Sequence, residues 1–118
     1  MQDAHIRDAY ALCEFAALLQ REIADLGNVD NWTEISAAAK LAELRAAQNL
    51  SRGDSFTTIS ASGSNAAVIH YKPVPKTDAK INDSAIYLGM LYQVTYQVIS
   101  EVLINFGTDK HVMALVYI

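Results

Sequence analysis

The stretch DSFTTISASGSNAAVIHY, residues 54–71, decides the fold, because the composition changes there from helix-forming to strand-forming residues. Residues 56–60 are β-branched and aromatic, which predicts a strand. Residues 62–65 have the composition of a turn. Residues 66–71 are a short apolar run typical of a buried strand, and His70 lies near its end.

The first of two predicted helices before this stretch covers residues 4–26. This segment contains neither Gly nor Pro and ends before Gly27, a common helix stop. One apolar stripe along it is predicted to be buried, with charged residues such as Asp8 lying mostly elsewhere around the helix. The residues of that stripe are Ile6, Tyr10, Cys13, Ala17 and Leu18.

The second helix is predicted to follow a turn at residues 27–31. Thr33 is its predicted N-cap, and Glu34 sits where the helix dipole favours an anion. Trp32 precedes the cap and is expected to pack against the first turn of the helix. The helix is predicted to run to about Gln48.

The sequence after residue 71 predicts a loop and further strands. The prolines in residues 72–76 predict an extended loop, because proline lacks an amide donor and disfavours helix before it. Residues 86–88 are a third strand candidate. Residues 90–104 have helical spacing but strand-forming composition, so both interpretations remain open. Two N-terminal helices packed on a mostly antiparallel sheet give an α+β fold class.

The composition excludes several classes of protein. Of 118 residues, 52% are hydrophobic and 19% are charged, which is typical of a globular chain. The formal net charge of −4 offers no basic surface for nucleic acid. The longest run without a charge, residues 84–100, is shorter than the about 20 apolar residues of a membrane span. With no visible signal peptide and a single cysteine, we expect a cytoplasmic protein that binds neither membrane nor nucleic acid.

Catalytic motifs do not appear in the sequence, and one residue stands out as a candidate. His5, His70 and His111 are far apart, and no metal-binding spacing, P-loop, GxGxxG or GxSxG is present. Cys13 is expected to be a buried, unreactive thiol, and His5 and His111 are expected at the surface. His70 lies beside a loop, where functional side chains often occur. A partly buried structural histidine is the alternative, and composition and spacing alone rank it first.

Several segments resemble the Xaa-Pro aminopeptidases (aminopeptidase P), which are metallopeptidases with the pita-bread (creatinase/aminopeptidase-like) fold. The core of the resemblance is residues 54–71, with the pattern Asn-Ala-Ala-x-x-His-Tyr at residues 65–71. The other matching segments are residues 5–9, 32–35, 40–45, 72–73 and 86–88. The resemblance covers about residues 3–88 and implies an incomplete pita-bread fold.

This resemblance implies metal-dependent removal of an N-terminal residue that precedes proline. Two divalent ions, usually manganese, activate a bridging water in that family. The family histidine that matches His70 lines the substrate pocket and helps to stabilise the tetrahedral intermediate. The resemblance therefore assigns His70 to substrate binding, ahead of the structural alternative. The implied partner is a peptide substrate with proline in second position.

The resemblance departs from the family pattern after residue 88. The family continues with Asp-Ser-Gly-Gly-x-Tyr and Thr-Thr-Asp-Ile-Thr-Arg-Thr, whose aspartates are metal ligands, but residues 89–105 contain no aspartate. The family's other ligands, a histidine and two glutamates, match nothing in this sequence. Glu101 alone cannot replace them, since a dinuclear site needs several carboxylates. We therefore assign no metal ligand and no catalytic residue, and expect the chain to bind no metal and to be inactive alone.

The departure predicts two parts: residues 1–88 as the N-terminal part of a pita-bread peptidase domain, and residues 89–118 as a divergent segment. Residues 106–108 resemble the family again, so we hypothesise a frame-shifted or alternatively spliced origin for residues 89–105. Two other functions remain open. One is a non-catalytic interaction protein that forms a homodimer, or pairs with a full-length relative, through an unsatisfied sheet edge. The other is a small ligand-binding domain around His70.

Overall fold

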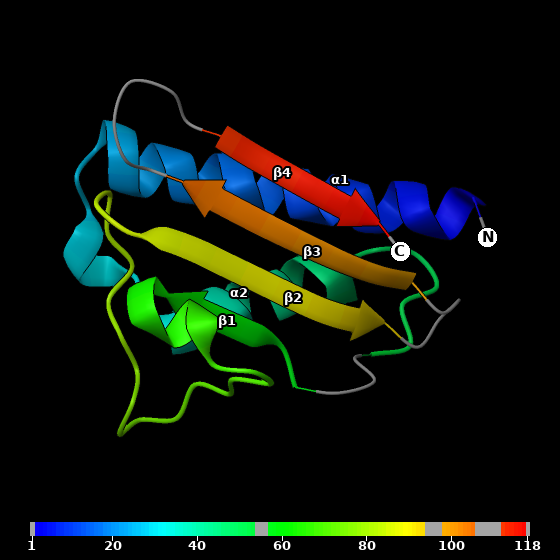
Figure 1. Cartoon of the computed structure of the whole chain (residues 1–118). Coiled ribbons are helices and arrows are strands. Elements are labelled where there is room, and N and C mark those ends of the chain that lie inside the picture. Colours follow the sequence, from blue (N-terminus) through cyan, green and yellow to red (C-terminus); the bar gives the residue numbers. More distant parts are fainter. Residues whose placement is uncertain (1, 54–56, 94–97, 106–111, 118) are drawn as a thin grey trace.

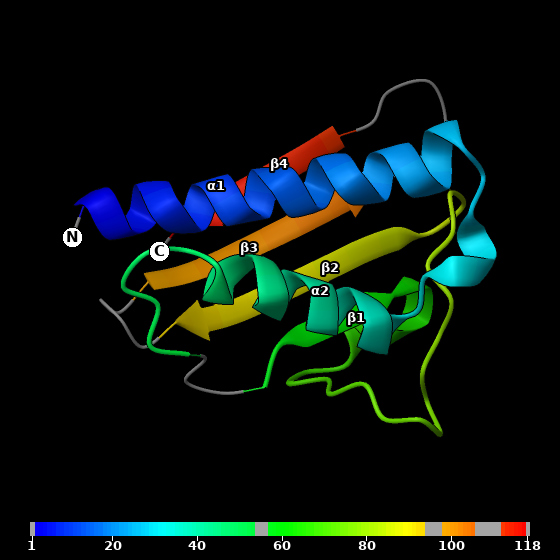
Figure 2. The same ribbon diagram turned by 180° about the vertical axis from the view of Figure 1, so that it is seen from behind.

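The computed structural model describes residues 2–53, 57–93, 98–105 and 112–117. Two helices lie across one face of an antiparallel sheet (Figures 1 and 2). The sheet has four strands in the order β1-β2-β3-β4. Their bounds are β1 Ile59–Ser62, β2 Ile86–Gln93, β3 Val98–Asn105 and β4 Val112–Tyr117. The predicted arrangement of two N-terminal helices on an antiparallel sheet is confirmed.

The first helix, α1, spans Gln2–Leu19 and continues into a π-helical segment, Gln20–Asp25. The chain then turns at Gly27, whose φ of +67° suits a residue without a side chain. The predicted helix and its stop are therefore confirmed. Neither α1 nor any other helix within the described ranges combines the length and apolarity that crossing a bilayer requires.

The face of α1 that contacts the sheet is not the predicted one. Ile6 and Tyr10 are 61% and 66% exposed, and Cys13 and Ala17 are exposed too, so the predicted buried stripe and the buried thiol are wrong. The buried residues are Ala4, Asp8, Ala11, Leu12, Phe15, Ala16 and Leu19. Both faces are apolar, but the buried one has Leu12, Phe15 and Leu19, whereas the aromatic residue of the exposed one carries a polar hydroxyl. Burying that face removes more apolar surface from water.

The second helix, α2, spans Glu34–Ala46 and begins as predicted. The Ser36 amide donates to Thr33 Oγ1 at 3.2 Å, and the Thr33 amide donates to Ser36 Oγ at 2.8 Å. This reciprocal pair is a capping box, in which serine replaces the usual glutamate. The helix ends two residues before the predicted Gln48, which is within the usual spread of helix boundaries.

Among the residues whose side chains the structure describes, the hydrophobic core lies between the two helices and β2. Its buried residues are Leu12, Phe15, Ala16, Leu19, Ile23, Ala37, Leu41, Ile81 and Tyr87. The rings of Phe15 and Tyr87 are 6.2 Å apart and tilted by 53°, a favourable aromatic arrangement. Trp32 packs against this cluster, and its contact with the first turn of α2 stays a prediction.

The strands after residue 57 agree with the prediction in part. β1 covers the end of the predicted strand 56–60 and continues to Ser62. Residue 56 lies outside the described residues. Residues 106–108 and His111, for which the sequence also gave expectations, lie outside them as well. β2 begins at Ile86 as predicted. Residues 90–93 and 98–104 form strands, so composition prevailed over helical spacing. The reason is tertiary, because each segment pairs with neighbouring strands.

The predicted buried strand at residues 66–71 is wrong. Gly63–Ala67 form a 3₁₀ helix, and a turn follows. Val68 and Ile69 are 54% and 87% exposed. The physical reason is pairing: β1 pairs only through residues 59–62 with β2, so the chain leaves the sheet at Gly63, whose φ is +59°. The predicted loop at residues 72–76 contains no helix or strand.

Candidate functional site

His70 lies in an exposed turn between the 3₁₀ helix and the proline loop, not at the end of a strand. The Tyr71 amide donates to the Val68 carbonyl at 3.2 Å, which closes this turn. The φ of His70 is +54°, a left-handed conformation that residues other than Gly seldom adopt. Such a backbone costs about 1–3 kcal/mol and persists only where the surroundings enforce it. The turn is therefore exposed to solvent, and the residues around it hold His70 in this backbone conformation.

A buried carboxylate, Glu34 at the start of α2, binds the two sides of the loop that contains His70. The amides of Ser62 and Ala79 donate to it at 2.7 and 3.2 Å. Asn65 Nδ2 donates at 3.0 Å, and the Tyr71 hydroxyl donates at 2.6 Å. Glu34 is fully buried, and hydrogen bonds to a buried charged group are among the stronger ones. These residues, with Glu34 at the centre, are called the Glu34 network below.

Backbone bonds fix the same loop to the first turn of α2. The Glu34 amide donates to the Ala79 carbonyl at 3.0 Å. The Ile35 amide donates to Asp78 Oδ1 at 3.0 Å, where an acidic side chain also suits the helix dipole. Both bonds satisfy amides that a helix start leaves without an intrahelical partner. The end of the loop that follows His70 is therefore as firmly placed as its beginning.

Tyr71 keeps its proton, and so stays a donor, over a wide pH range. Burial raises the pKa of its hydroxyl above the ordinary 10.0, and the hydrogen bond to Glu34 raises it further. Asn65 Nδ2 also lies 3.0 Å from the hydroxyl oxygen. The residue next to His70 is thus held through a neutral phenol that bonds to a buried carboxylate.

A second hydroxyl pair extends the Glu34 network into the sheet. Ser60 Oγ donates to the Glu34 carbonyl at 2.7 Å and lies 2.8 Å from the Tyr87 hydroxyl. Tyr87 is fully buried, and burial raises its pKa well above the ordinary value. These bonds connect the start of α2 with β1 and β2. The network therefore rests on the hydrophobic core rather than on the loop alone.

The residues whose side chains the structure describes do not fit a two-metal site. Between residues 2 and 53, and between 57 and 89, no three His, Cys, Asp or Glu side chains lie close enough to hold an ion. Both carboxylate oxygens of Glu34 already accept N–H or O–H donors, which a cation would have to displace. Because two dications require several carboxylates, we derive no metal-dependent step from these residues.

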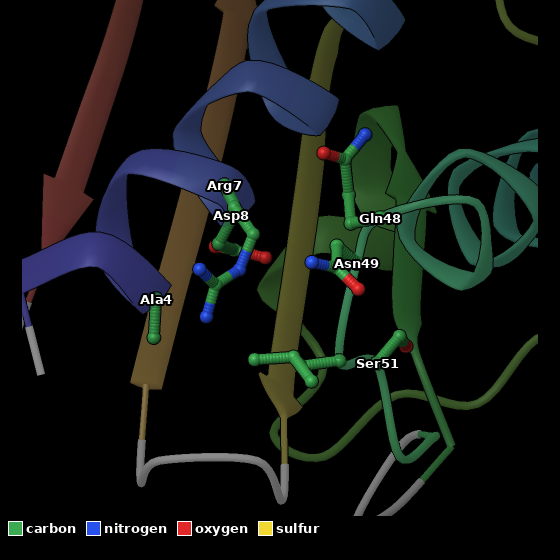
Figure 3. A pocket seen from close by; sticks show the side chains of 7 residues that line it. Ala4, Arg7, Asp8, Gln48, Asn49 and Ser51 are labelled. Carbon is green, nitrogen blue, oxygen red and sulfur yellow. The ribbon is translucent and has the colours of Figure 1, made fainter.

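A buried ion pair lies apart from the Glu34 network and joins the two helices. Arg45 Nε lies 2.7 Å from Asp8 Oδ1, and both side chains are buried. Figure 3 shows a small hollow beside Asp8, between α1 and the residues that follow α2. The hollow is lined by Ala4, Arg7, Asp8, Gln48, Asn49, Leu50 and Ser51. It includes no residue of the Glu34 network, and Asp8 faces the core although the sequence placed it outside the buried stripe.

The sequence indicated His70 but not the residues that position it. Asn65 and Tyr71 belong to the same Asn-Ala-Ala-x-x-His-Tyr pattern, and that pattern was the available signal. Glu34 was interpreted only as an anion at a helix start. Its amide donors Ser62 and Ala79 are 28 and 45 positions away, so no local pattern could reveal the connection.

Comparison with models of known protein families identifies a match to this chain. The model of metallopeptidase family M24 matches residues 1–114. The chain is 48% identical over 86 residues to the Xaa-Pro aminopeptidase ApepP of Drosophila melanogaster, and 40% identical over 88 residues to aminopeptidase P2 of Arabidopsis thaliana. These alignments cover 73% and 75% of this chain but 14% and 12% of the relatives. The chain therefore spans about a seventh of the length of these relatives or less.

A solved structure shows the same arrangement of elements. X-prolyl aminopeptidase from Caenorhabditis elegans, a cytosolic enzyme with a di-nuclear active site, superimposes with a TM-score of 0.72 at 31% sequence identity. The match covers 87% of this chain and 16% of the other. The predicted fold class, part of a pita-bread fold with two helices on an antiparallel sheet, is confirmed by this likeness.

Proposed function

This chain belongs to metallopeptidase family M24, and from that premise we propose that it serves the removal of an N-terminal residue preceding proline. Within that reaction we assign His70 to binding the peptide substrate. Membership confirms the resemblance to Xaa-Pro aminopeptidases found in the sequence. It also weighs against an unrelated ligand-binding domain around the same histidine.

The observation that supports this role is the strained, exposed turn at His70. Its φ is +54°, and Glu34 accepts the hydroxyl of the adjacent Tyr71. A structural histidine would be buried with hydrogen-bond partners, whereas this one is exposed, and its neighbours bear the structural bonds. Strain maintained at an exposed imidazole favours a binding role. A positioned N–H of the imidazole can donate to a peptide carbonyl oxygen, where charge develops during acyl transfer.

We further propose that the chain has no peptidase activity by itself. In the family it resembles, two divalent ions, which we take to be manganese, polarise the carbonyl group and activate water. The described side chains do not fit such a site, and residues 89–105 contain no aspartate. The chain would then provide only the part of the substrate pocket around His70. Catalysis would need ligands from other residues of the same fold.

The first experiment measures activity of the whole chain. The purified chain is incubated with manganese and a peptide whose second residue is proline, and release of the N-terminal residue is followed. We expect no release above that in buffer. Turnover at the rate of a complete enzyme would contradict the proposed inactivity, and retained activity after chelation would exclude a metal mechanism.

A second experiment tests His70 without requiring activity. The same peptide is titrated into the chain while the side-chain resonances of the histidines are followed by NMR. We expect the His70 signals to shift and those of His5 to stay unchanged. His70→Ala should abolish saturable binding, and His5→Ala should not. Equal affinity of His70→Ala and the unaltered chain would overturn the assignment.

We also propose two parts with different origins, residues 1–88 and residues 89–118. The curated relatives align over 86 to 88 residues, close to the length of the first part. The match to the family model continues to residue 114, so the sequence of the coding DNA is needed to test whether the two parts differ in origin. We expect another reading frame past codon 88 to encode an Asp-x-Gly or Thr-Asp-Ile pattern. If neither frame does, a frame-shifted origin is wrong.

The alternative role that we propose is non-catalytic interaction. β4 ends the strand order β1-β2-β3-β4, so its outer edge pairs with no strand in the described part of the chain. Such an edge can pair with a second copy or with a full-length relative. We place the chain in the cytoplasm, since its structural relative is a cytosolic enzyme and a single cysteine suits a reducing compartment.

A further inference from the structure

The outer face of α1 exposes an apolar stripe where helices usually expose polar residues. The stripe consists of Ile6, Tyr10, Cys13 and Ala17. Ile6 and Tyr10 are 61% and 66% exposed, and Cys13 and Ala17 are exposed as well. It lies opposite the face that packs on the sheet, and Figure 2 shows α1 as an outer layer beside α2. A contiguous exposed apolar stripe indicates an interaction surface.

We propose that this stripe pairs with the same stripe of a second copy of the chain, with the two α1 helices antiparallel. The spacing of four, three and four positions is that of a two-stranded coiled-coil seam. An amphipathic helix that only covers a core needs one apolar face, and α1 already has one buried on the sheet. The second face therefore suits another helix.

The charges beside the stripe favour this partner and define the register. When Tyr10 lies opposite Cys13 of the second copy, Ile6 lies opposite Ala17. The same register brings Arg7 opposite Glu14 of the second copy, and the two-fold axis repeats that pair. Charge pairs at these flanking positions determine partner and orientation in coiled coils. The stripe and its flanking charges are thus complementary to themselves.

The two charged residues are available for such a pair. Glu14 is exposed, and Arg7 is half-buried at the hollow beside α1 (Figure 3). No ion pair within the described residues includes either of them. The long arginine stem can redirect the guanidinium by rotation about its side-chain bonds. Two antiparallel helices also place opposite ends of their dipoles together.

A parallel pair of helices would not use these charges. In that arrangement the flanking contacts join residues five positions apart, so Arg7 would face Gln2 and Glu14 would face Ala9 of the other copy. Charge reversal would then have little effect. The antiparallel arrangement is therefore the one that the flanking residues favour, and reversal of single charges can distinguish the two.

The contact is small, so we expect a weak dimer. Residues 6–17 span about 18 Å of helix at a rise of 1.5 Å per residue. That is less than a standard protein interface, which buries about 800 Å² on each partner. Association should therefore depend on concentration. This inference deepens the alternative role in interaction and does not depend on the peptidase proposal, because its test measures mass rather than turnover.

Sedimentation equilibrium of the whole chain under reducing conditions tests the dimer. We expect a concentration-dependent monomer–dimer equilibrium. Arg7→Glu and Glu14→Arg should each raise the dissociation constant at least tenfold, because each places like charges opposite one another. The double variant should return to within about threefold of the original value, since both pairs are restored in reverse.

Arg21→Glu is the matched control. It makes the same charge change as Arg7→Glu, but Arg21 lies in the π-helical segment after α1, beyond residues 6–17 that the proposed contact joins. We expect no change in dimerisation. A general charge effect would instead make Arg21→Glu and Arg7→Glu alike, and would make Glu14→Arg strengthen the dimer, because the chain is net acidic.

Three outcomes would overturn the inference. One is a monomer at every accessible concentration, as expected if the stripe contacts another kind of partner. Another is a dimer that neither single reversal weakens, as expected for pairing through the β4 edge or for parallel helices. The third is a double variant that dimerises no better than the single ones. Circular dichroism of each variant checks folding, and Glu14→Arg, at an exposed position, keeps the test valid if Arg7→Glu unfolds.

Discussion

The Tyr71 hydroxyl donates a 2.6 Å hydrogen bond to Oε2 of Glu34, which lies 37 positions earlier in the chain. This bond connects the start of α2 with the residue next to His70. Because both side chains are buried, it is protected from competing water. The position of the only candidate site residue thus depends on a carboxylate that belongs to another element.

Glu34→Gln should lower the free energy of unfolding by about 2–3 kcal/mol. The amide can no longer accept hydrogen bonds on both sides, so at least one buried donor of Ser62, Tyr71 or Ala79 loses its partner. Urea unfolding measures the change. Glu43→Gln is the matched control, because its side chain is exposed and pairs with Lys40. That variant should change stability by less than about 1 kcal/mol.

Stability should fall as the pH rises above about 10. The pKa values of Tyr71 and Tyr87 are raised above 10.0, so the folded state holds these protons more tightly than the unfolded state. Their contribution is complete below the unfolded pKa and is lost as the pH rises toward the folded values. Urea midpoints measured from about pH 8, below the unfolded pKa, to about pH 11, above it, give the slope.

Tyr87→Phe should flatten that alkaline slope, because it removes the group with the larger shift. At pH 8 the cost should be about 1 kcal/mol, since Ser60 keeps its bond to the Glu34 carbonyl. A slope equal to that of the unaltered chain would show that lysines, rather than the buried tyrosines, cause the alkaline loss.

His70→Gly should leave the free energy of unfolding unchanged or raise it by up to about 1 kcal/mol. Glycine adopts φ of +54° without strain, which offsets the flexibility that it adds to the unfolded chain. Lys72→Gly is the matched control at an exposed neighbour without positive φ, and should lower stability by about 0.5–1 kcal/mol. Thermal unfolding compares the two. A clear loss of stability in His70→Gly would favour the structural interpretation of this histidine.

Asp8→Ala should lower the free energy of unfolding by about 3–5 kcal/mol, because it removes the carboxylate from a buried guanidinium. Combining Asp8→Leu with Arg45→Met should cost less than Asp8→Ala, since neither charge of this pair remains buried. Asp30→Ala serves as control: its pair with Lys80 is exposed, and its loss should cost much less stability than the loss of Asp8. Denaturant unfolding of all three variants tests this order.

The sequence predicted those elements whose signals are local. The start of α2 was predicted correctly because Thr33 and Ser36 cap the helix within one turn. The stop at Gly27 and the beginning of β2 at Ile86 depend on similarly short patterns. His70 was found through a seven-residue pattern and a resemblance, although the strand proposed for it does not exist.

Predictions that depended on a distant partner failed. α1 is apolar on two faces, and only packing on the sheet decided that Leu12, Phe15 and Leu19 face inward while Tyr10 and Cys13 face solvent. Residues 66–71 have the composition of a buried strand but no strand to pair with. Local composition cannot reveal whether a partner strand is present, because pairing joins residues far apart in the chain.

By itself the sequence determined the two helices, the cap of α2, the beginning of β2, the loop with prolines and the family to which the chain belongs. These depend on neighbouring residues or on a pattern kept within one segment. Only the tertiary structure decided which face of α1 is buried and that Glu34 positions the turn at His70. The hydrogen bonds to Glu34 join residues 28 to 45 positions apart, and such contacts exist only after the chain has folded.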